Sequence, residues 1–103
     1  SGATNTVTLV GSLQDEAGCD ADWNPGCEAT YMENMDGIWT ITVTLPAGDY
    51  EYKVAINADW AENYGANGEA DGANIALSLS EETEVTFTWD QESKVVTDSH
   101  NEM

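Results

Sequence analysis

Residues 48–65, GDYEYKVAINADWAENYG, contain the clearest strand pattern of the chain. In the first half of this stretch every second side chain is apolar or aromatic, namely Tyr50, Tyr52, Val54 and Ile56. Successive side chains of a β-strand point to opposite faces of its sheet, so these four residues are expected to face the core. The intervening Lys53 is then expected to face outward.

Trp60 follows this strand, among the turn-forming residues Asn57, Ala58 and Asp59. No apolar period surrounds it, so its indole ring is expected to be displayed to solvent rather than buried. Lys53, one of two basic residues in the chain, lies seven positions before it. A single cation on the outer face of a strand, beside a displayed tryptophan, indicates a binding site.

Six other stretches have strand character, because they alternate or are rich in β-branched residues. They are residues 6–12, 29–35, 38–45, 75–79, 85–89 and 94–97. Tyr31 is the expected inward residue of the second of these stretches, and Trp39 is an inward residue of the third. Turn signals recur about every ten residues without a helical period, which predicts an all-β chain, an immunoglobulin-like antiparallel β-sandwich of about seven strands.

Two long segments, residues 13–26 and 61–73, lack any period and are expected to be loops. Trp23 lies near the tip of the first, and Tyr64 lies within the second. Long loops in compact domains commonly carry function. The length of 103 residues predicts a single domain, residues 1–103, with flexible ends at residues 1–4 and 98–103.

The chain is strongly acidic, with 20 acidic and 2 basic residues and a formal net charge of -18. Such a surface repels phosphate backbones and anionic lipid headgroups, so neither nucleic acid nor a membrane is an expected partner. No run of 18 or more apolar residues is present, which argues against a membrane-spanning segment.

Cys19 and Cys27 bracket an acidic loop without histidine neighbours, so a disulfide is favoured over a zinc site. In the chain-entropy model, closing so short a loop stabilises the fold by about 2.6 kcal/mol. Disulfides persist in oxidising compartments, and the protein is therefore expected to be secreted or displayed at the cell surface. Two free thiols in a cytosolic protein are the alternative.

Catalysis is not expected, because the only histidine is His100 in the expected tail and no Ser-His-Asp pattern occurs. The many acids are read as solvated surface. Carboxylates are ligands for hard cations, and Asp20, Asp22, Asp59 and Glu62 form an alternative set for calcium, although their spacing is not that of an EF-hand. No cofactor is predicted.

Aromatic rings outside the core are candidate stacking platforms for sugars, whose C–H faces are apolar. The candidates are Trp23, Trp60 and Tyr64. Side chains that could hydrogen-bond the sugar hydroxyls are Lys53, Asn57 and Asn63, and Asp59 belongs to the same candidate site. The alternative is that the tryptophans fold back on the sandwich as a peripheral cluster.

Several motifs resemble a known family: Gly11-Ser12-Leu13, the cysteine loop ending at Trp23, the run LPAGDYEYK at 45–53, and NADW at 57–60. They are similar to the non-catalytic modules of pullulanases and related starch-binding proteins, and in particular to pullulanase-associated modules of starch-adherence proteins of gut bacteria. The resemblance implies an immunoglobulin-like fold and α-glucan binding, with Trp23, Lys53 and Trp60 at the positions of the family's binding residues.

The function expected from these observations is non-catalytic binding of starch or another α-1,4- or α-1,6-glucan, including maltooligosaccharides. The chain would act as a monomeric module that targets a larger secreted or cell-surface protein to starch. The alternative is a structural spacer or protein-interaction sandwich that has lost sugar binding. A calcium-stabilised acidic module would explain the charge but not the tryptophans. Display of Trp23 and Trp60 on one surface distinguishes the first two readings.

Overall fold

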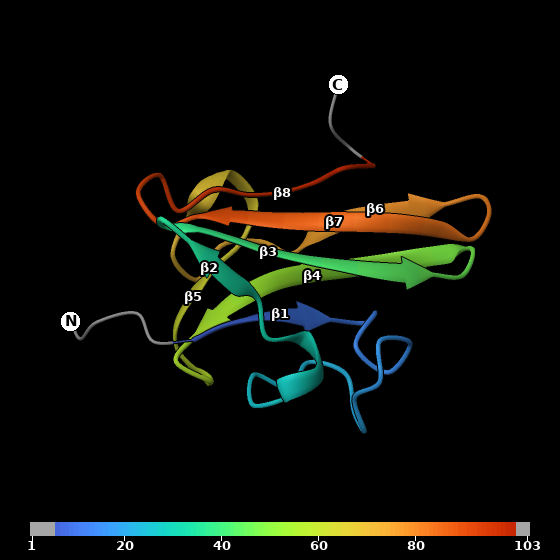
Figure 1. The fold of residues 1–103 in the computed structure, drawn as a ribbon, viewed down its shortest axis with the longest axis horizontal. Coiled ribbons are helices and arrows are strands. Elements are labelled where there is room, and N and C mark those ends of the chain that lie inside the picture. The colour runs from blue at the N-terminus through green and yellow to red at the C-terminus, as the bar shows by residue number, and fades with distance from the viewer. Residues whose placement is uncertain (1–5, 101–103) are drawn as a thin grey trace.

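The computed structural model describes residues 6–100 and shows two antiparallel sheets packed face to face (Figure 1). The first sheet contains β1 (Val7–Gly11), β4 (Gly48–Ile56), β5 (Asp59–Tyr64) and β6 (Ile75–Leu79). The second sheet contains β2 (Glu33–Met35), β3 (Ile38–Leu45), β7 (Thr83–Asp90) and β8 (Val96–Asp98). Two short 3-10 helices are η1 (Glu28–Thr30) and η2 (Ala66–Gly68). The predicted immunoglobulin-like sandwich is confirmed.

β4 is the central strand of the first sheet. β1 pairs with its residues 52–56, and on the opposite edge β5 pairs with residues 54–56 and β6 with residues 48–52. The four predicted inward residues are all buried: Tyr50, Tyr52, Val54 and Ile56. The ring of Tyr52 meets Phe87 of the second sheet edge to face, with ring centroids 4.9 Å apart. The residues that alternate inward in the sequence therefore form the contact between the two sheets.

The second sheet is organised by a continuous pairing of β3 with β7, from Ile38 opposite Asp90 to Leu45 opposite Thr83. Trp39 is buried as predicted, and its indole N–H donates to the side-chain oxygen of Gln91 at 2.9 Å. This hydrogen bond satisfies the one polar group of the ring, which allows a tryptophan to contribute its full apolar area to the core.

Residues 6–100 contain eight strands, against the predicted number of about seven, because part of the expected loop 61–73 forms β5. Asn57 and Ala58 have φ angles of 58° and 59° and form a tight turn between the paired residues Ile56 and Asp59. Two successive positive φ angles are typical of hairpin turns whose twist matches the strands. β5 itself carries a register shift opposite Ala55 and Ile56, which obscures any alternation.

Two other expectations are wrong. In residues 29–35 the strand begins only at Glu33, and Met32 rather than Tyr31 is buried, because the Met32 N–H donates to the Val7 carbonyl beside β1. Asp98 is not part of a flexible end: it lies in β8, is buried, and accepts a hydrogen bond from the Tyr52 hydroxyl across the core. The expected end at residues 1–4 lies outside the described residues.

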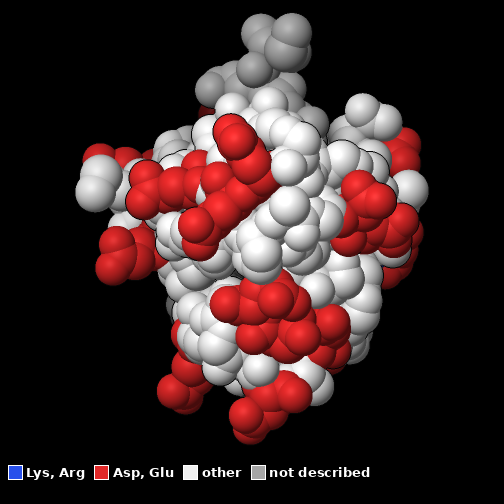
Figure 2. Space-filling model, turned by 90° about the vertical axis from the view of Figure 1, so that its right-hand side faces the viewer, with Lys and Arg blue, Asp and Glu red and all other residues white. Residues whose placement is uncertain are grey.

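The surface is dominated by carboxylates. Figure 2 shows several acidic patches on one side of the molecule and no basic side chain there. Glu16 illustrates the crowding, since a hydrogen bond and charge repulsion from Asp15 raise the pKa of its carboxyl group. Among residues 6–100 no helix is long and apolar enough to cross a membrane.

Candidate functional site

The outer face of the first sheet is partly covered by the connection between β1 and β2. Thr8 and Val10 point away from the core, on the face opposite Val7 and Leu9, yet both are fully buried. The Thr8 hydroxyl donates to the Pro25 carbonyl at 2.8 Å, and η1 packs against β1. The segment 12–31, blue to cyan in Figure 1, therefore lies on the outside of the first sheet. We call it the covering loop.

Gln14 holds the covering loop together from inside. Its side-chain N–H groups donate to the Asn24 carbonyl at 2.8 Å and to the Thr30 hydroxyl at 3.1 Å. Its oxygen accepts from the Asn24 N–H at 2.8 Å and from the Gly11 N–H at 3.2 Å. The amide thus uses both its donors and both acceptor positions, and fixes the backbone directly after Trp23.

The sequence analysis did not identify Gln14. A glutamine among acidic loop residues has the signature of a solvated side chain, and no periodicity marks it as buried. Its burial depends on the covering loop closing around it, which only the tertiary structure shows.

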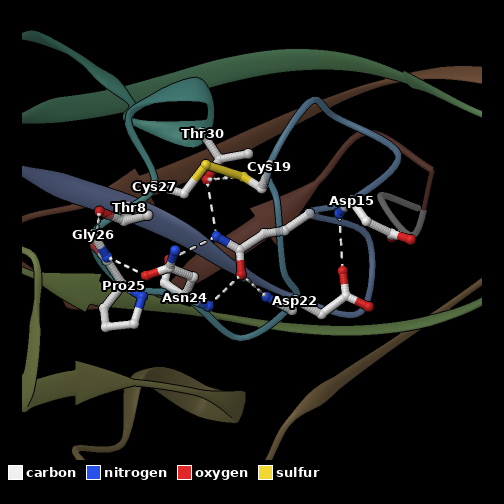
Figure 3. Close-up of a disulfide and its surroundings, with 11 residues drawn as sticks. Thr8, Asp15, Cys19, Asp22, Asn24, Pro25, Gly26, Cys27 and Thr30 are labelled. Carbon is white, nitrogen blue, oxygen red and sulfur yellow. Dashed lines mark hydrogen bonds between the residues drawn. A yellow bond between two sulfur atoms is a disulfide. The ribbon is translucent and has the colours of Figure 1, made fainter.

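The predicted disulfide between Cys19 and Cys27 is confirmed, with an S–S distance of 2.09 Å and a Cα–Cα distance of 6.0 Å. It closes the segment that contains Trp23, and Figure 3 shows it beside Thr30. The bridge and the Gln14 amide therefore constrain the same short segment from two sides.

Trp23 has a strained backbone. Its φ angle is 57°, in the left-handed region that bulky residues rarely adopt, and its N–H donates to the Gly11 carbonyl at 3.3 Å. Such a conformation costs about 1–3 kcal/mol and persists only where surrounding contacts impose it. Here the disulfide and the Gln14–Asn24 hydrogen bonds impose it. The half-buried indole ring forms one wall of a surface cavity of about 360 Å³, lined by Ser12, Trp23, Asp49, Tyr50, Glu51, Ala76 and Ser78.

Lys53 lies on this same outer face, and Trp60 lies on the hairpin at the edge of the sheet. Lys53 alternates with the inward residues Tyr52 and Val54 and pairs with Val10 of β1, whose side chain also points outward. Trp60 lies at the start of β5, two residues after the tight turn at Asn57 and Ala58, at the edge of the same sheet. Trp60 is 38% exposed, which confirms the predicted display of its ring.

Asn57 and Asp59 shape the hairpin that carries Trp60. The Asn57 N–H donates to the Thr6 carbonyl at 2.8 Å, and its side-chain oxygen accepts from the Thr6 N–H at 3.3 Å. Asp59 caps the bend by accepting from the Ala61 N–H at 3.0 Å. Both residues are exposed.

Asn63 supports the hairpin from below rather than facing solvent. It is 5% exposed, and its amide donates to the Trp60 carbonyl at 3.0 Å and to the Asp71 carboxylate at 2.9 Å. It therefore positions the backbone of Trp60, instead of offering its donors to a ligand as the sequence analysis expected.

Tyr64 is not a stacking platform, contrary to expectation. It is 9% exposed, and its ring stacks on Trp89 with centroids 5.6 Å apart, under the ammonium group of Lys94. Its hydroxyl donates to Glu62, and this hydrogen bond together with burial raises the pKa of Tyr64 to about 12. The ring is thus packed against the protein, because β5 carries Tyr64 inward opposite Val54.

The acids considered for calcium do not form a cluster. Within the described part of the chain, no group of three or more His, Cys, Asp or Glu side chains is placed to hold a metal ion. The Asp22 carboxylate instead accepts from the Asp15 N–H at 2.8 Å, within the covering loop (Figure 3).

These features define a small β-sandwich domain with an aromatic-bearing outer face. Residues 6–96 match the family model described as the pullulanase X25 domain. The chain belongs to this family, which confirms the resemblance read from its motifs.

Individual relatives agree with this assignment. An amylopullulanase from Thermoanaerobacterium saccharolyticum is 45% identical over 84 residues, which are 80% of this chain and 7% of the relative. The pullulanase from Bacillus acidopullulyticus aligns with a TM-score of 0.86 and 32% identity, over 98% of this chain and 12% of that one. The ligand-induced structure of AmyP-SBD shares the fold, with a TM-score of 0.55 and 18% identity over 92% of this chain and 71% of that one. The chain thus spans a small part of the pullulanases that it matches.

Proposed function

We propose that the chain is a non-catalytic carbohydrate-binding module that binds starch-type α-glucans through Trp23, Lys53 and Trp60. The observation that carries this proposal is the position of Trp23, a strained residue that a disulfide and a buried amide hold over the outer face that also bears Lys53. Trp60 is exposed on the hairpin at the edge of the same sheet. A loop built to hold a tryptophan at a partly exposed position, at a cost in backbone strain, is better explained by binding than by packing.

The chemistry of the three residues fits a neutral sugar. The C–H faces of a pyranose are apolar and stack on indole rings, while the hydroxyl groups find polar partners at the rim. Lys53 supplies donors between the two tryptophans in strand order. A neutral ligand is also compatible with a net charge of -18, which disfavours anionic ligands at any distance shorter than the screening length.

The relatives support the same substrate class. They are named pullulanase and amylopullulanase, and the structural neighbour AmyP-SBD is by its name a starch-binding domain. The present chain matches only 7% of the amylopullulanase, so we assign it attachment to glucan rather than cleavage. A monomeric module of a larger secreted or cell-surface protein fits this role, and the disulfide suits an oxidising compartment.

The test is isothermal titration of maltoheptaose against Trp23→Ala and Trp60→Ala, with thermal melts alongside. Two platforms that share one flexible chain are both needed, because neither ring alone buries enough sugar surface to offset the ordering of the ligand. Each variant should therefore bind at least about tenfold more weakly, about 1.4 kcal/mol, with little change in melting temperature. Full binding by both variants would contradict the proposal and favour a spacer domain. Weak binding with a large fall in melting temperature would mean that the tryptophans are structural.

A further inference from the structure

The cavity beside Trp23 has a construction of its own. Its floor is made by the outward residues of β6, Ala76 and Ser78, which pair with Glu51 and Asp49 of β4. The hollow exists because β6 carries small side chains exactly where a larger one would fill the space under the indole ring. Trp60 and Lys53 are not among the lining residues, so the cavity is separate from both of these side chains.

The polar groups around the cavity are ordered. The Glu51 carboxylate accepts a hydrogen bond from the Asn74 amide at 3.0 Å, which orients it beside the hollow. The Ser12 hydroxyl oxygen accepts from the Glu51 N–H at 3.0 Å, which holds Ser12 at the rim with its own hydroxyl proton available for donation. Asp49 is exposed on the same face, opposite Ser78.

This set of groups selects the chemistry of the occupant. Ionised carboxylates are acceptors only, so the ligand must bring donors, and an anionic ligand would be repelled by the charge of the site. The indole wall favours a ligand with a flat apolar face. A pyranose meets these conditions, because its 2- and 3-hydroxyls form a vicinal pair of donors that α-1,4 and α-1,6 linkages leave free.

We propose that the cavity is a second subsite, which holds one glucosyl unit between the Trp23 ring and the carboxylates of Glu51 and Asp49. This inference rests on the proposed function and deepens it: one glucan chain runs from Trp60 past Lys53 to Trp23 and places a unit in the cavity. A volume of about 360 Å³ lies at the lower end of the range for small-molecule pockets, which suits one or two sugar rings.

The test fills the cavity without touching any tryptophan. Ala76 is exposed in β6, so Ala76→Phe should fold normally while its ring occupies the floor of the subsite. Its affinity for maltoheptaose should fall about tenfold, a loss comparable to that of Trp23→Ala. The matched control is Thr97→Phe, the same new side chain at an exposed position of β8 in the other sheet, which should bind like the wild type.

A second variant keeps the test valid if phenylalanine disturbs the sheet. Glu51→Gln preserves shape and removes the charge, and should lower affinity about fivefold, the loss expected for one hydrogen bond. This loss should disappear in the Trp23→Ala background, because both residues contact the same sugar unit, and should persist in the Trp60→Ala background. An equal loss in both backgrounds would overturn the shared subsite.

The outcomes separate this inference from the proposed function. If Trp23→Ala and Trp60→Ala lose binding while Ala76→Phe and Glu51→Gln bind like the wild type, the platforms are real and the cavity is not a subsite. If the wild-type chain does not bind maltoheptaose, both proposals fail together.

Discussion

The outer faces of the two sheets differ, although both arise from the same alternation of residues. The outer face of the second sheet carries hydroxyl groups on paired threonines. Thr40 pairs with Thr88, and Thr42 pairs with Thr86, with 2.9 Å between the last two hydroxyl oxygens. A hollow of about 240 Å³ there is lined by Thr86, Thr88, Thr97, Asp98 and Ser99, without an aromatic ring. The outer face of the first sheet carries Lys53, the covering loop places Trp23 over it, and the hairpin at the edge of the sheet displays Trp60.

The difference lies in the connections. The strands of the second sheet that carry the threonines are linked to the first sheet by short turns, such as residues 46–47 and 80–82. The first sheet receives the covering loop and the hairpin at Asn57 and Ala58, and each carries a tryptophan at the surface. Strand alternation therefore builds the scaffold, and the long connections decide where the tryptophans reach the surface.

The largest effect is expected at the contact that joins the two sheets, Tyr52 with Asp98. Burial, and then the hydrogen bond to Asp98, raise the pKa of the Tyr52 hydroxyl well above its ordinary value of 10. The unfolded chain releases this proton near pH 10 and the folded chain does not, so stability is present below pH 10 and is lost as the pH rises above it. The whole sandwich should unfold in alkali, with circular dichroism and tyrosinate absorbance changing together.

Tyr52→Phe is the control for this alkaline transition. It removes the titrating group, so the transition should move to higher pH, although stability at neutral pH falls because the buried Asp98 carboxylate loses the hydrogen bond from Tyr52. Ionisation of all tyrosines before any loss of structure would contradict the assignment.

Removal of the disulfide tests how far the covering loop depends on this cross-link. Replacing both Cys19 and Cys27 by serine should lower the free energy of unfolding by about 2.6 kcal/mol in the chain-entropy model. Affinity for maltoheptaose should also fall toward that of Trp23→Ala, because the strained backbone of Trp23 loses one of its two constraints. Denaturant unfolding and titration measure the two effects. Lost stability with full binding would show that the Gln14 hydrogen bonds alone hold Trp23.

Lys53 and Lys94 allow a sharper comparison, because Lys53 lies on the outer face of the first sheet and Lys94 lies against the rings of Tyr64 and Trp89. Lys53→Ala should weaken glucan binding by about 1 kcal/mol, the scale of a hydrogen bond to a charged donor, and leave stability nearly unchanged. Lys94→Ala removes the same charge from above Tyr64 and Trp89, and should lower stability without changing affinity. Isothermal titration of maltoheptaose and thermal melts of both variants measure the affinity and the stability. If Lys53→Ala unfolds the protein but binds normally, the lysine is structural.

The smallest effect is expected on the threonine face. Thr42→Ala combined with Thr86→Ala removes an exposed hydroxyl pair, and both stability and maltoheptaose affinity should stay within about 0.5 kcal/mol of the wild type. The measurements are a denaturant titration and calorimetry. A clear loss of binding would break the contrast between the two outer faces and move part of the site to the second sheet.

Local patterns in the sequence were sufficient for the scaffold. Alternation around Tyr52 and Trp39 identified the inward faces of β4 and β3, and the spacing of Cys19 and Cys27 identified the disulfide. The display of Trp60 also followed from the sequence, because no apolar period existed to bury it. These inferences succeed because strand periodicity and loop closure depend on residues that are close in the sequence. A strand that buries one face shows this periodicity whatever it packs against.

The tertiary structure alone decided the environment of those residues whose contacts come from distant segments. β5 is a strand because it pairs with β4 after a tight turn, although its register shift hides the alternation. Tyr64 is buried because Trp89 and Lys94 meet it from the other sheet, and Gln14 is buried because the covering loop closes around its amide. Burial of a polar or aromatic side chain depends on which partners the fold brings to it, and those partners lie tens of positions away in the sequence.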